Sequence, residues 1–451
     1  MNFGSLVFPD GFRWGCATSG YQNEGDNRGS DWWEWEQGAG HIAGGQRSGR
    51  ACDWWDGGFT ADLAWMTRLH NNAHRLGVEW SRIEPRAGYF DDAAIDRYRS
   101  MLQALRDRGI EPMVTLHHFS NPLWFAQRGG WERPEAVVPF ERYVDRVIQR
   151  LGDLCDSWIT VNEPAIYAVL GYLGGGGDGE RHQTTFPPGR SDFGLTLRVL
   201  CNLLLAHAAA YRVIHARQPH ARVGIAHNVQ ALDPVRPDSR LDRVVLAMQD
   251  RLIHQSVVDA IVHGRLPRAL GSRSEPRLRG TADFLGLNYY SRELVAFDWR
   301  SPATAFGHRV QNPDGEISDG NFGEVFPEGL YRVLRGLQGT GLPLFVTENG
   351  VPDRRDARRP AFLVNHIAWL HRALRDGVRV DGYFHWTLTD NFEWAEGWNL
   401  RFGLVELDPV TQARSLRKSG ELYAEICKAN GLARDTVTRF TPELEARLFE
   451  A

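Results

Sequence analysis

The chain has 451 residues, of which 42% are hydrophobic and 24% are charged, and its formal net charge is −4 at pH 7. This composition is typical of a globular protein with a large core, and the near balance of charge gives no reason to expect a nucleic acid or an acidic membrane surface as partner. No window approaches about 18 uninterrupted apolar residues, so we expect no transmembrane helix.

Short apolar runs recur along the chain, and each is followed by a longer segment with helical spacing. The runs cover residues 12–18, 73–78, 111–116, 158–162, 222–226, 284–288, 344–347 and 382–386. In the segments between them, apolar residues recur mostly at i, i+3 and i+4, as in residues 94–108, 139–151, 195–218, 241–262 and 361–376. Eight buried strands that alternate with helices predict a closed parallel barrel rather than an open sheet. We therefore expect the α/β class, with residues 1–451 forming one (β/α)8 TIM barrel domain.

The cysteines are odd in number and scattered: Cys16, Cys52, Cys155, Cys201 and Cys427. They form no CxxC pair, which argues against a zinc knuckle or a disulfide framework. The N-terminus shows no basic segment followed by an apolar run, and residues 8–12 read as the start of the fold. We expect reduced thiols, a cytoplasmic protein and no metal or other cofactor.

One stretch of biased composition, residues 174–179, reads Gly-Gly-Gly-Gly-Asp-Gly. A phosphate-binding loop would end in Lys-Ser/Thr before a helix, whereas Glu180-Arg181-His182 follows here. We interpret the stretch as a surface loop that borders the mouth of a site, because it comes after the fourth predicted strand.

Tryptophan is abundant, with 16 residues, and two interpretations compete. One is a large core. The other is a carbohydrate site, in which flat aromatic faces stack on sugar rings while polar groups bind the hydroxyls. Clusters such as residues 31–35 and 53–56 combine both kinds of side chain.

Two glutamates follow predicted strands in a way that suits glycoside hydrolysis. Glu163 ends the fourth strand, before Pro164, and Glu348 ends the seventh, before Asn349-Gly350. A closed barrel brings all strand carboxyl ends to the face where its active sites lie. A retaining glycosidase needs two carboxyl groups about 5–5.5 Å apart, one as acid/base and one as nucleophile. Taken singly, each glutamate also fits a buried structural pair with an arginine.

The two segments, TVNEP (160–164) and VTENG (346–350), resemble the signature motifs of glycoside hydrolase family 1, the β-glucosidase and β-galactosidase barrels. Five further segments resemble other strands and loops of this family, in family order: FRWGCATSGYQNEG (12–25), RLGVEWSRIEP (75–85), TLHHF (115–119), GLNYY (286–290) and WTLTDNFEW (386–394). The resemblance runs from residue 8 to about residue 403 and so covers nearly the whole chain.

The resemblance implies catalytic roles for five of these residues. Glu163 would be the acid/base and Glu348 the nucleophile. We expect the pKa of Glu163 to lie above that of Glu348, and the negative charge of Glu348 to help raise it. Arg75 and Tyr290 would hold the nucleophile ionised and oriented, because a cation and a phenol donor lower a carboxyl pKa. Asn162 would donate to the sugar 2-hydroxyl.

The remaining matched positions concern binding of the sugar. The resemblance implies that four residues bind its other hydroxyls: Gln22, His118, Glu393 and Trp394. Trp386 would form the platform beneath the ring. Asn288 would support the floor of the site or contact the sugar directly. The adjacent His117 and His118 do not suggest a metal, because neighbours on a strand point to opposite faces.

Two positions bear on specificity. Phe119 stands where many family members have a tryptophan, so an indole hydrogen bond is lost. Members that cleave 6-phosphoglycosides carry a serine at the position of Glu393, and a carboxylate there would repel a phosphate. We therefore expect an unphosphorylated β-glycoside or oligosaccharide as substrate, most simply a β-glucoside, with galactosides and fucosides also open.

Three alternatives are compared with this prediction. A transglycosidase would share the covalent intermediate but transfer the sugar to an alcohol. A sugar-binding protein without catalysis would lack one carboxylate, yet both are present. A Ser-His-Asp hydrolase is disfavoured because no Gly-x-Ser-x-Gly segment occurs.

Overall fold

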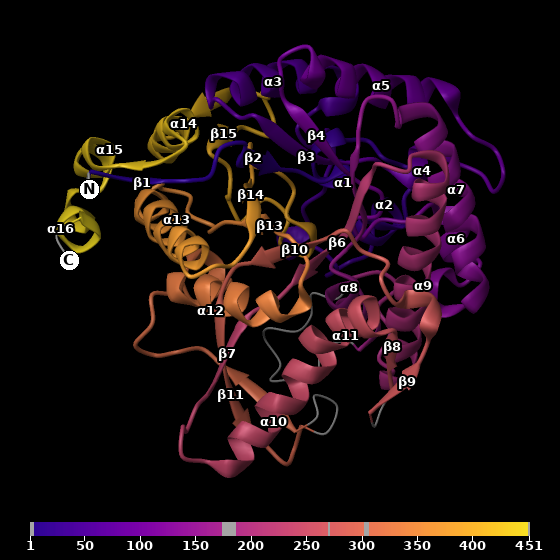
Figure 1. Ribbon diagram of the computed structural model, residues 1–451. Coiled ribbons are helices and arrows are strands. Elements are labelled where there is room, and N and C mark those ends of the chain that lie inside the picture. The colour runs from indigo at the N-terminus through magenta and orange to yellow at the C-terminus, as the bar shows by residue number, and fades with distance from the viewer. Residues whose placement is uncertain (1–3, 174–185, 269–270, 302–305, 450–451) are drawn as a thin grey trace.

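A computed structural model describes residues 4–173, 186–268, 271–301 and 306–449. Its centre is a closed barrel of eight parallel strands, and helices surround the barrel (Figure 1). The strands follow chain order around the barrel: β2 (Arg13–Ala17), β3 (Ala73–Gly77), β4 (Glu111–Thr115), β5 (Ser157–Asn162), β6 (Arg222–Asn228), β10 (Phe284–Tyr289), β13 (Leu344–Asn349) and β14 (Val380–Trp386). β14 pairs with β2 and closes the ring. The predicted fold class and all eight strands are confirmed.

The outer layer contains the five predicted helical segments and several others. The long helices are α3 (Gly58–Arg68), α5 (Asp92–Arg106), α7 (Val137–Leu151), α9 (Phe193–Arg217), α10 (Arg240–Asp250), α11 (Ser256–His263), α12 (Pro327–Leu337), α13 (Arg359–Arg375) and α14 (Lys418–Ala429). The prediction of one helix over residues 241–262 is wrong in one respect. A π-helical segment, Arg251–Gln255, separates α10 from α11. A single wider turn of this kind leaves the helical spacing of apolar residues almost unchanged, so the sequence pattern did not reveal it.

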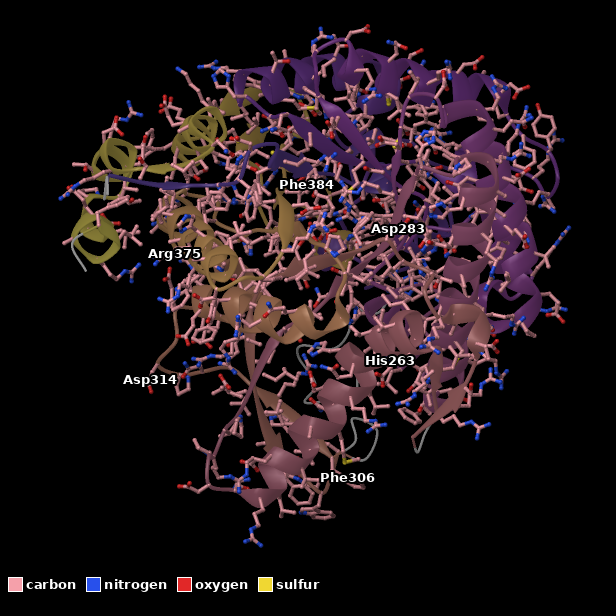
Figure 2. The ribbon with its side chains drawn as sticks, in the orientation of Figure 1. His263, Asp283, Phe306, Asp314, Arg375 and Phe384 are labelled. Carbon is pink, nitrogen blue, oxygen red and sulfur yellow. The ribbon has the colours of Figure 1, made fainter. Side chains whose placement is uncertain are left out.

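The loops after β6 and β10 form an additional sheet that the sequence patterns did not reveal. β7 (Ala231–Pro234), β11 (Arg292–Phe297) and β12 (Gly307–Val310) pair in the order β12-β11-β7, and α10 packs on them. This unit projects below the barrel in the view of Figure 1, and Figure 2 places Phe306 near its lower end.

The barrel interior is filled by a separate hydrophobic cluster. It contains large aromatic rings from the three neighbouring strands β10, β13 and β14, among them Phe284, Phe345 and Phe384. Phe384 lies at the centre of the molecule in Figure 2. Small residues make room for these rings, and one of them is Gly224 on β6, which pairs with Phe284 on β10. The barrel is thus a packed core, as such barrels are.

The 25-residue helix α9 is long and apolar enough to span a membrane by length and composition alone. It instead packs against α7 and α8 (Pro164–Tyr172), and 61% of its most apolar window is buried against the rest of the protein. The helix therefore has the character of a core element.

The packing of the interior predicts a stability effect at Gly224. A Cβ at this position would lie 2.6 Å from both the ring and the carbonyl oxygen of Phe284. We expect Gly224→Ala to lower the free energy of unfolding by roughly 1–3 kcal/mol, the usual penalty for overpacking. Thermal unfolding followed by circular dichroism would measure the loss.

The matched control is Gly336→Ala on α12, where an added Cβ would meet nothing within 4 Å. This change should leave the midpoint unchanged or raise it, because alanine favours a helix interior by about 0.5–1 kcal/mol over glycine. Equal midpoints for the two variants would contradict the close contact at Gly224.

Candidate active site

The two predicted carboxyl groups lie at the carboxyl-terminal end of the barrel. Glu348 is near the end of β13, and Glu163 directly follows β5 and precedes α8. Both are almost fully buried, with 3% and 6% of their surface exposed. Their placement on the fourth and seventh barrel strands agrees with the prediction.

Glu348 accepts hydrogen bonds on both of its oxygens. The Arg75 Nη1 group donates to Oε1 at 2.6 Å, and the Tyr290 hydroxyl donates to Oε2 at 2.5 Å. Arg75 is fully buried and is itself held by Thr115 Oγ1 at 3.1 Å and by the Thr347 carbonyl at 3.0 Å. The carboxylate is therefore fixed in orientation by two donors, one on β3 and one directly after β10.

Glu163 has a different set of partners, both of them amides. Asn288 Nδ2 donates to Oε1 at 2.7 Å, and Asn228 Nδ2 donates to the same oxygen at 3.1 Å. Asn228 was missed in the sequence because the predicted fifth strand ended at residue 226, two residues too early. A polar side chain at the end of a barrel strand is the signal that would have found it.

The two carboxyl groups differ in what sets their pKa. Burial and, after it, the charge of Glu348 together raise the pKa of Glu163 to about 8, against the lowering effect of the two amides. Burial also raises the pKa of Glu348, but the Arg75 charge and the Tyr290 hydroxyl act to lower it. The contributions of Arg75 and Tyr290 have the predicted sign, although burial outweighs them. A cation and a phenol thus favour the ionised form of Glu348, whereas the groups that donate to Glu163 are neutral amides.

The side-chain amide of Asn162 connects Arg75 and Asn288 to His118, one of the sugar-binding candidates. Asn162 Oδ1 accepts from Arg75 Nη2 at 2.7 Å and from Asn288 Nδ2 at 3.1 Å. Its Nδ2 group lies 3.1 Å from His118 Nε2, so that nitrogen accepts and Nδ1 carries the proton. Burial and the charge of Arg75 lower the pKa of His118. His118 Nδ1 is buried without a hydrogen-bond partner among the described residues, which leaves a donor for a ligand hydroxyl.

His117 and His118 contact different groups, although both lie beyond the end of β4 and not on a strand as predicted. His117 Nε2 donates to Asn121 Oδ1 at 3.1 Å, and the same oxygen accepts from Trp131 Nε1 at 2.8 Å. Over the ranges that the structure describes, no three His, Cys, Asp or Glu side chains are grouped to hold a metal ion.

The remaining sugar-binding candidates come from the loops after β2 and β14. Gln22 Nε2 donates to Glu393 Oε2 at 3.1 Å. Burial and the charge of Glu348 raise the pKa of Glu393 to about 8, while hydrogen bonds from Trp386 and Gln22 lower it. The rings of Trp386 and Trp394 both stack near His118, with ring centroids 5.9 and 6.0 Å from it. Contacts therefore link all the residues predicted for the site.

Three of the site segments contain non-glycine residues with a left-handed backbone. They are Glu163 (φ 47°), Phe119 (φ 70°) and Trp394 (φ 49°). Such conformations are unfavourable for residues other than glycine and cluster at functional sites. Phe119 packs against Trp394, with ring centroids 5.3 Å apart, and so contributes to the aromatic wall.

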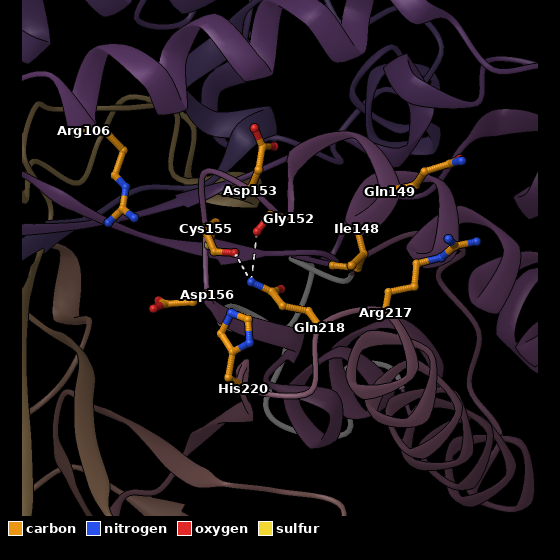
Figure 3. Close-up of a pocket in the computed structure, with 10 residues that line it drawn as sticks. All are labelled: Arg106, Ile148, Gln149, Gly152, Asp153, Cys155, Asp156, Arg217, Gln218 and His220. Carbon is orange, nitrogen blue, oxygen red and sulfur yellow. Dashed lines mark hydrogen bonds between the residues drawn. The ribbon is translucent and has the colours of Figure 1, made fainter.

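A separate surface pocket lies at the opposite end of the barrel (Figure 3). It is lined by residues that precede the strands, among them Cys155 and Asp156 before β5, and Gln218 and His220 before β6. Gln218 Nε2 donates to the carbonyl oxygens of Gly152 and Cys155, each at 2.9 Å. This end of a barrel serves stability rather than catalysis.

The glycine-rich stretch 174–179, predicted to border the mouth, lies outside the described residues.

A barrel with two buried carboxyl groups at its carboxyl-terminal end, one oriented by an arginine and the other by amides, defines the class of barrel glycosidases. The family model of glycosyl hydrolase family 1 matches residues 5–432. The chain therefore belongs to glycosyl hydrolase family 1 and is a glycosidase of that family.

Individual relatives agree with this assignment over nearly the whole chain. A β-galactosidase of Pyrococcus woesei is 31% identical, over 95% of this chain and 98% of its own length. β-Glucosidase A of Thermotoga maritima is 32% identical, over 94% of this chain and 98% of its own length. The solved structure of a β-glycosidase from Pyrococcus horikoshii superposes with a TM-score of 0.88 at 36% identity and covers 98% of this chain and 100% of that one.

The electrostatic coupling of the two carboxyl groups predicts a pKa shift. In Glu348→Gln the neighbouring negative charge is gone, so we expect the pKa of Glu163 to fall below its wild-type value of about 8. Carbon-detected NMR of labelled glutamate side chains across a pH titration would follow it. An unchanged or higher pKa of Glu163 in the variant would contradict the coupling.

Proposed function

We propose that the protein is a retaining β-glycosidase that hydrolyses terminal non-reducing β-D-glucosyl residues through a covalent glycosyl-enzyme intermediate. One observation carries this proposal. Two buried carboxyl groups share the site, and their hydrogen-bond partners divide them into one oriented for attack, Glu348, and one that holds a proton, Glu163.

In the first step Glu163 gives its proton to the glycosidic oxygen, and the bond from that oxygen to the anomeric carbon breaks. A Glu348 oxygen forms a bond to the anomeric carbon from the opposite face, so the sugar becomes an ester of the enzyme. Arg75 and Tyr290 support the nucleophile by orienting its oxygens. The proton on Glu163 is available near neutral pH because burial and Glu348 raise its pKa.

In the second step the proton requirement reverses. Once Glu348 is esterified its charge is lost, and the pKa of Glu163 falls by the contribution of that charge, although burial still raises it. Glu163 then takes a proton from water as the water oxygen attacks the anomeric carbon, and Glu348 leaves as a carboxylate. Two inversions at one carbon retain the β configuration.

The sugar is bound by groups left available in this arrangement. The second proton of Asn162 Nδ2 donates to the 2-hydroxyl, and His118 Nδ1, Gln22, Glu393 and the Trp394 side chain bind the others, over a floor formed by Trp386. The carboxyl group at position 393 would repel a phosphate when ionised and offers it no positive charge when protonated, which favours an unphosphorylated sugar. Galactosides and fucosides remain candidate substrates, since relatives named for glucosidase and for galactosidase activity are about equally similar to this chain.

The acid role of Glu163 predicts a dependence on the leaving group. Glu163→Ala should slow the cleavage of alkyl β-glucosides by about 10²–10⁴-fold, while activated aryl β-glucosides, which depart without protonation, lose far less in the first step. Steady-state and burst kinetics on a leaving-group series would measure both. Glu348→Gln is the matched control and should abolish activity on all of them. Equal losses across the series in Glu163→Ala would argue against the acid assignment.

The double displacement predicts the stereochemistry of the first product. Proton NMR recorded in the first minutes of hydrolysis should show the β-anomer of the released sugar, before mutarotation. A panel of aryl β-glucosides, galactosides and fucosides in the same assay would rank the sugars. An α-anomer as first product would refute retention.

A further inference from the structure

One buried carboxyl group beside the site takes no part in the steps above. Glu79 follows β3 and precedes the short helix α4 (Trp80–Ile83), and only 2% of its surface is exposed. The nearby Arg82 does not pair with it, because Arg82 Nε donates to Glu24 at 2.6 Å. A buried carboxyl group without an adjacent ion pair needs hydrogen-bond donors to be tolerated.

The donors come from both of the neighbouring loops. The Tyr21 backbone N–H donates to Glu79 Oε1 at 2.9 Å. Oε2 accepts from Asn27 Nδ2 at 2.9 Å and from the Ser120 hydroxyl at 2.7 Å, with the Ser81 hydroxyl at 3.4 Å. One carboxyl group therefore joins the segment after β2 to the segment after β4.

These contacts are adjacent to two sugar-binding candidates. Tyr21 is the chain neighbour of Gln22, and both belong to α1 (Gly20–Glu24). Ser120 is two residues after His118, across the left-handed turn at Phe119. A Cβ at Gly20 would lie 2.6 Å from Glu79 Cγ, so the approach of this carboxyl group to α1 depends on a glycine there.

We infer that Glu79 is a positioning residue that sets the distance between Gln22 and His118, and through it the recognition of the sugar hydroxyls. It does not touch the substrate and acts only through the two loops that it joins. The inference rests on the proposed function, because it assigns to Gln22 and His118 the binding of the sugar.

Glu79→Gln tests the inference because an amide keeps the size but offers a single acceptor oxygen. The NH2 group of the new glutamine then faces donors from one of the two loops and cannot accept their hydrogen bonds. We therefore expect kcat/KM on an aryl β-glucoside to fall at least about tenfold. The decisive measurement is a double-mutant cycle with Gln22→Ala. If Glu79 acts through Gln22, Glu79→Gln should cost less than about threefold in the Gln22→Ala background.

Ser120→Ala provides a second and milder variant, because it removes one donor on the His118 side alone. The decrease in kcat/KM caused by Ser120→Ala should be absent in a His118→Ala background and should persist in a Gln22→Ala background. Asp353→Asn is the matched control. Asp353 is also 2% exposed and accepts from the backbone N–H groups of Arg358 and Arg359, and its substitution should leave kcat/KM unchanged.

Two results would overturn the inference: unaltered kcat/KM in Glu79→Gln, or a loss of the same size with and without Gln22. The thermal midpoint of each variant separates unfolding from misplacement, and if Glu79→Gln does not fold, the Ser120→Ala cycles decide alone. A wild-type protein inactive on every aryl β-glycoside would instead refute the proposed function, so the two failures are distinguishable.

Discussion

Four strands of the barrel meet at the guanidinium group of Arg75. It projects from β3 and donates to the Thr115 hydroxyl on β4, to Asn162 on β5, and to both the Thr347 carbonyl and the Glu348 carboxylate on β13. A fully buried cation is tolerable only with such a complete set of acceptors. The same contacts orient the proposed nucleophile and fix the amide of Asn162, which we propose binds the 2-hydroxyl, so the stability of the barrel end and the geometry of the site depend on one side chain.

The position of the Arg75 charge also explains why the carboxyl groups of the site differ in their tendency to ionise. The charge of Glu348 raises the pKa of both Glu163 and Glu393, and these two groups accept from neutral amide or indole donors rather than from a cation. The arginine favours ionisation at Glu348, and burial keeps the proton on the other two. The raised pKa of Glu163 therefore follows first from its burial and then from the nearby charge of Glu348, while the Arg75 guanidinium donates to Glu348 instead.

The eight strands and the paired glutamates were predictable because each strand is a buried apolar run with polar residues at its end. Asn228 was missed by a two-residue error at one strand end. The β12-β11-β7 unit has mixed burial and no clean period, so no sequence pattern marked it. Glu79 is an ordinary glutamate in the sequence. Its donors lie 58 positions before it and 41 after it, and only the fold brings them together.

The backbone at Phe119 shows why such remote contacts matter for recognition. A left-handed conformation at a non-glycine residue costs about 1–3 kcal/mol and persists only where neighbours over-determine it. The turn is held on its carboxyl side by two buried carboxyl groups, since Ser120 donates to Glu79 at 2.7 Å and the Asn121 backbone N–H donates to Asp31 at 2.8 Å. On its amino side, Asn162 holds the His118 ring. The His118 ring therefore cannot turn without breaking a buried hydrogen bond, which holds its Nδ1 donor, unpaired among the described residues, in a fixed direction.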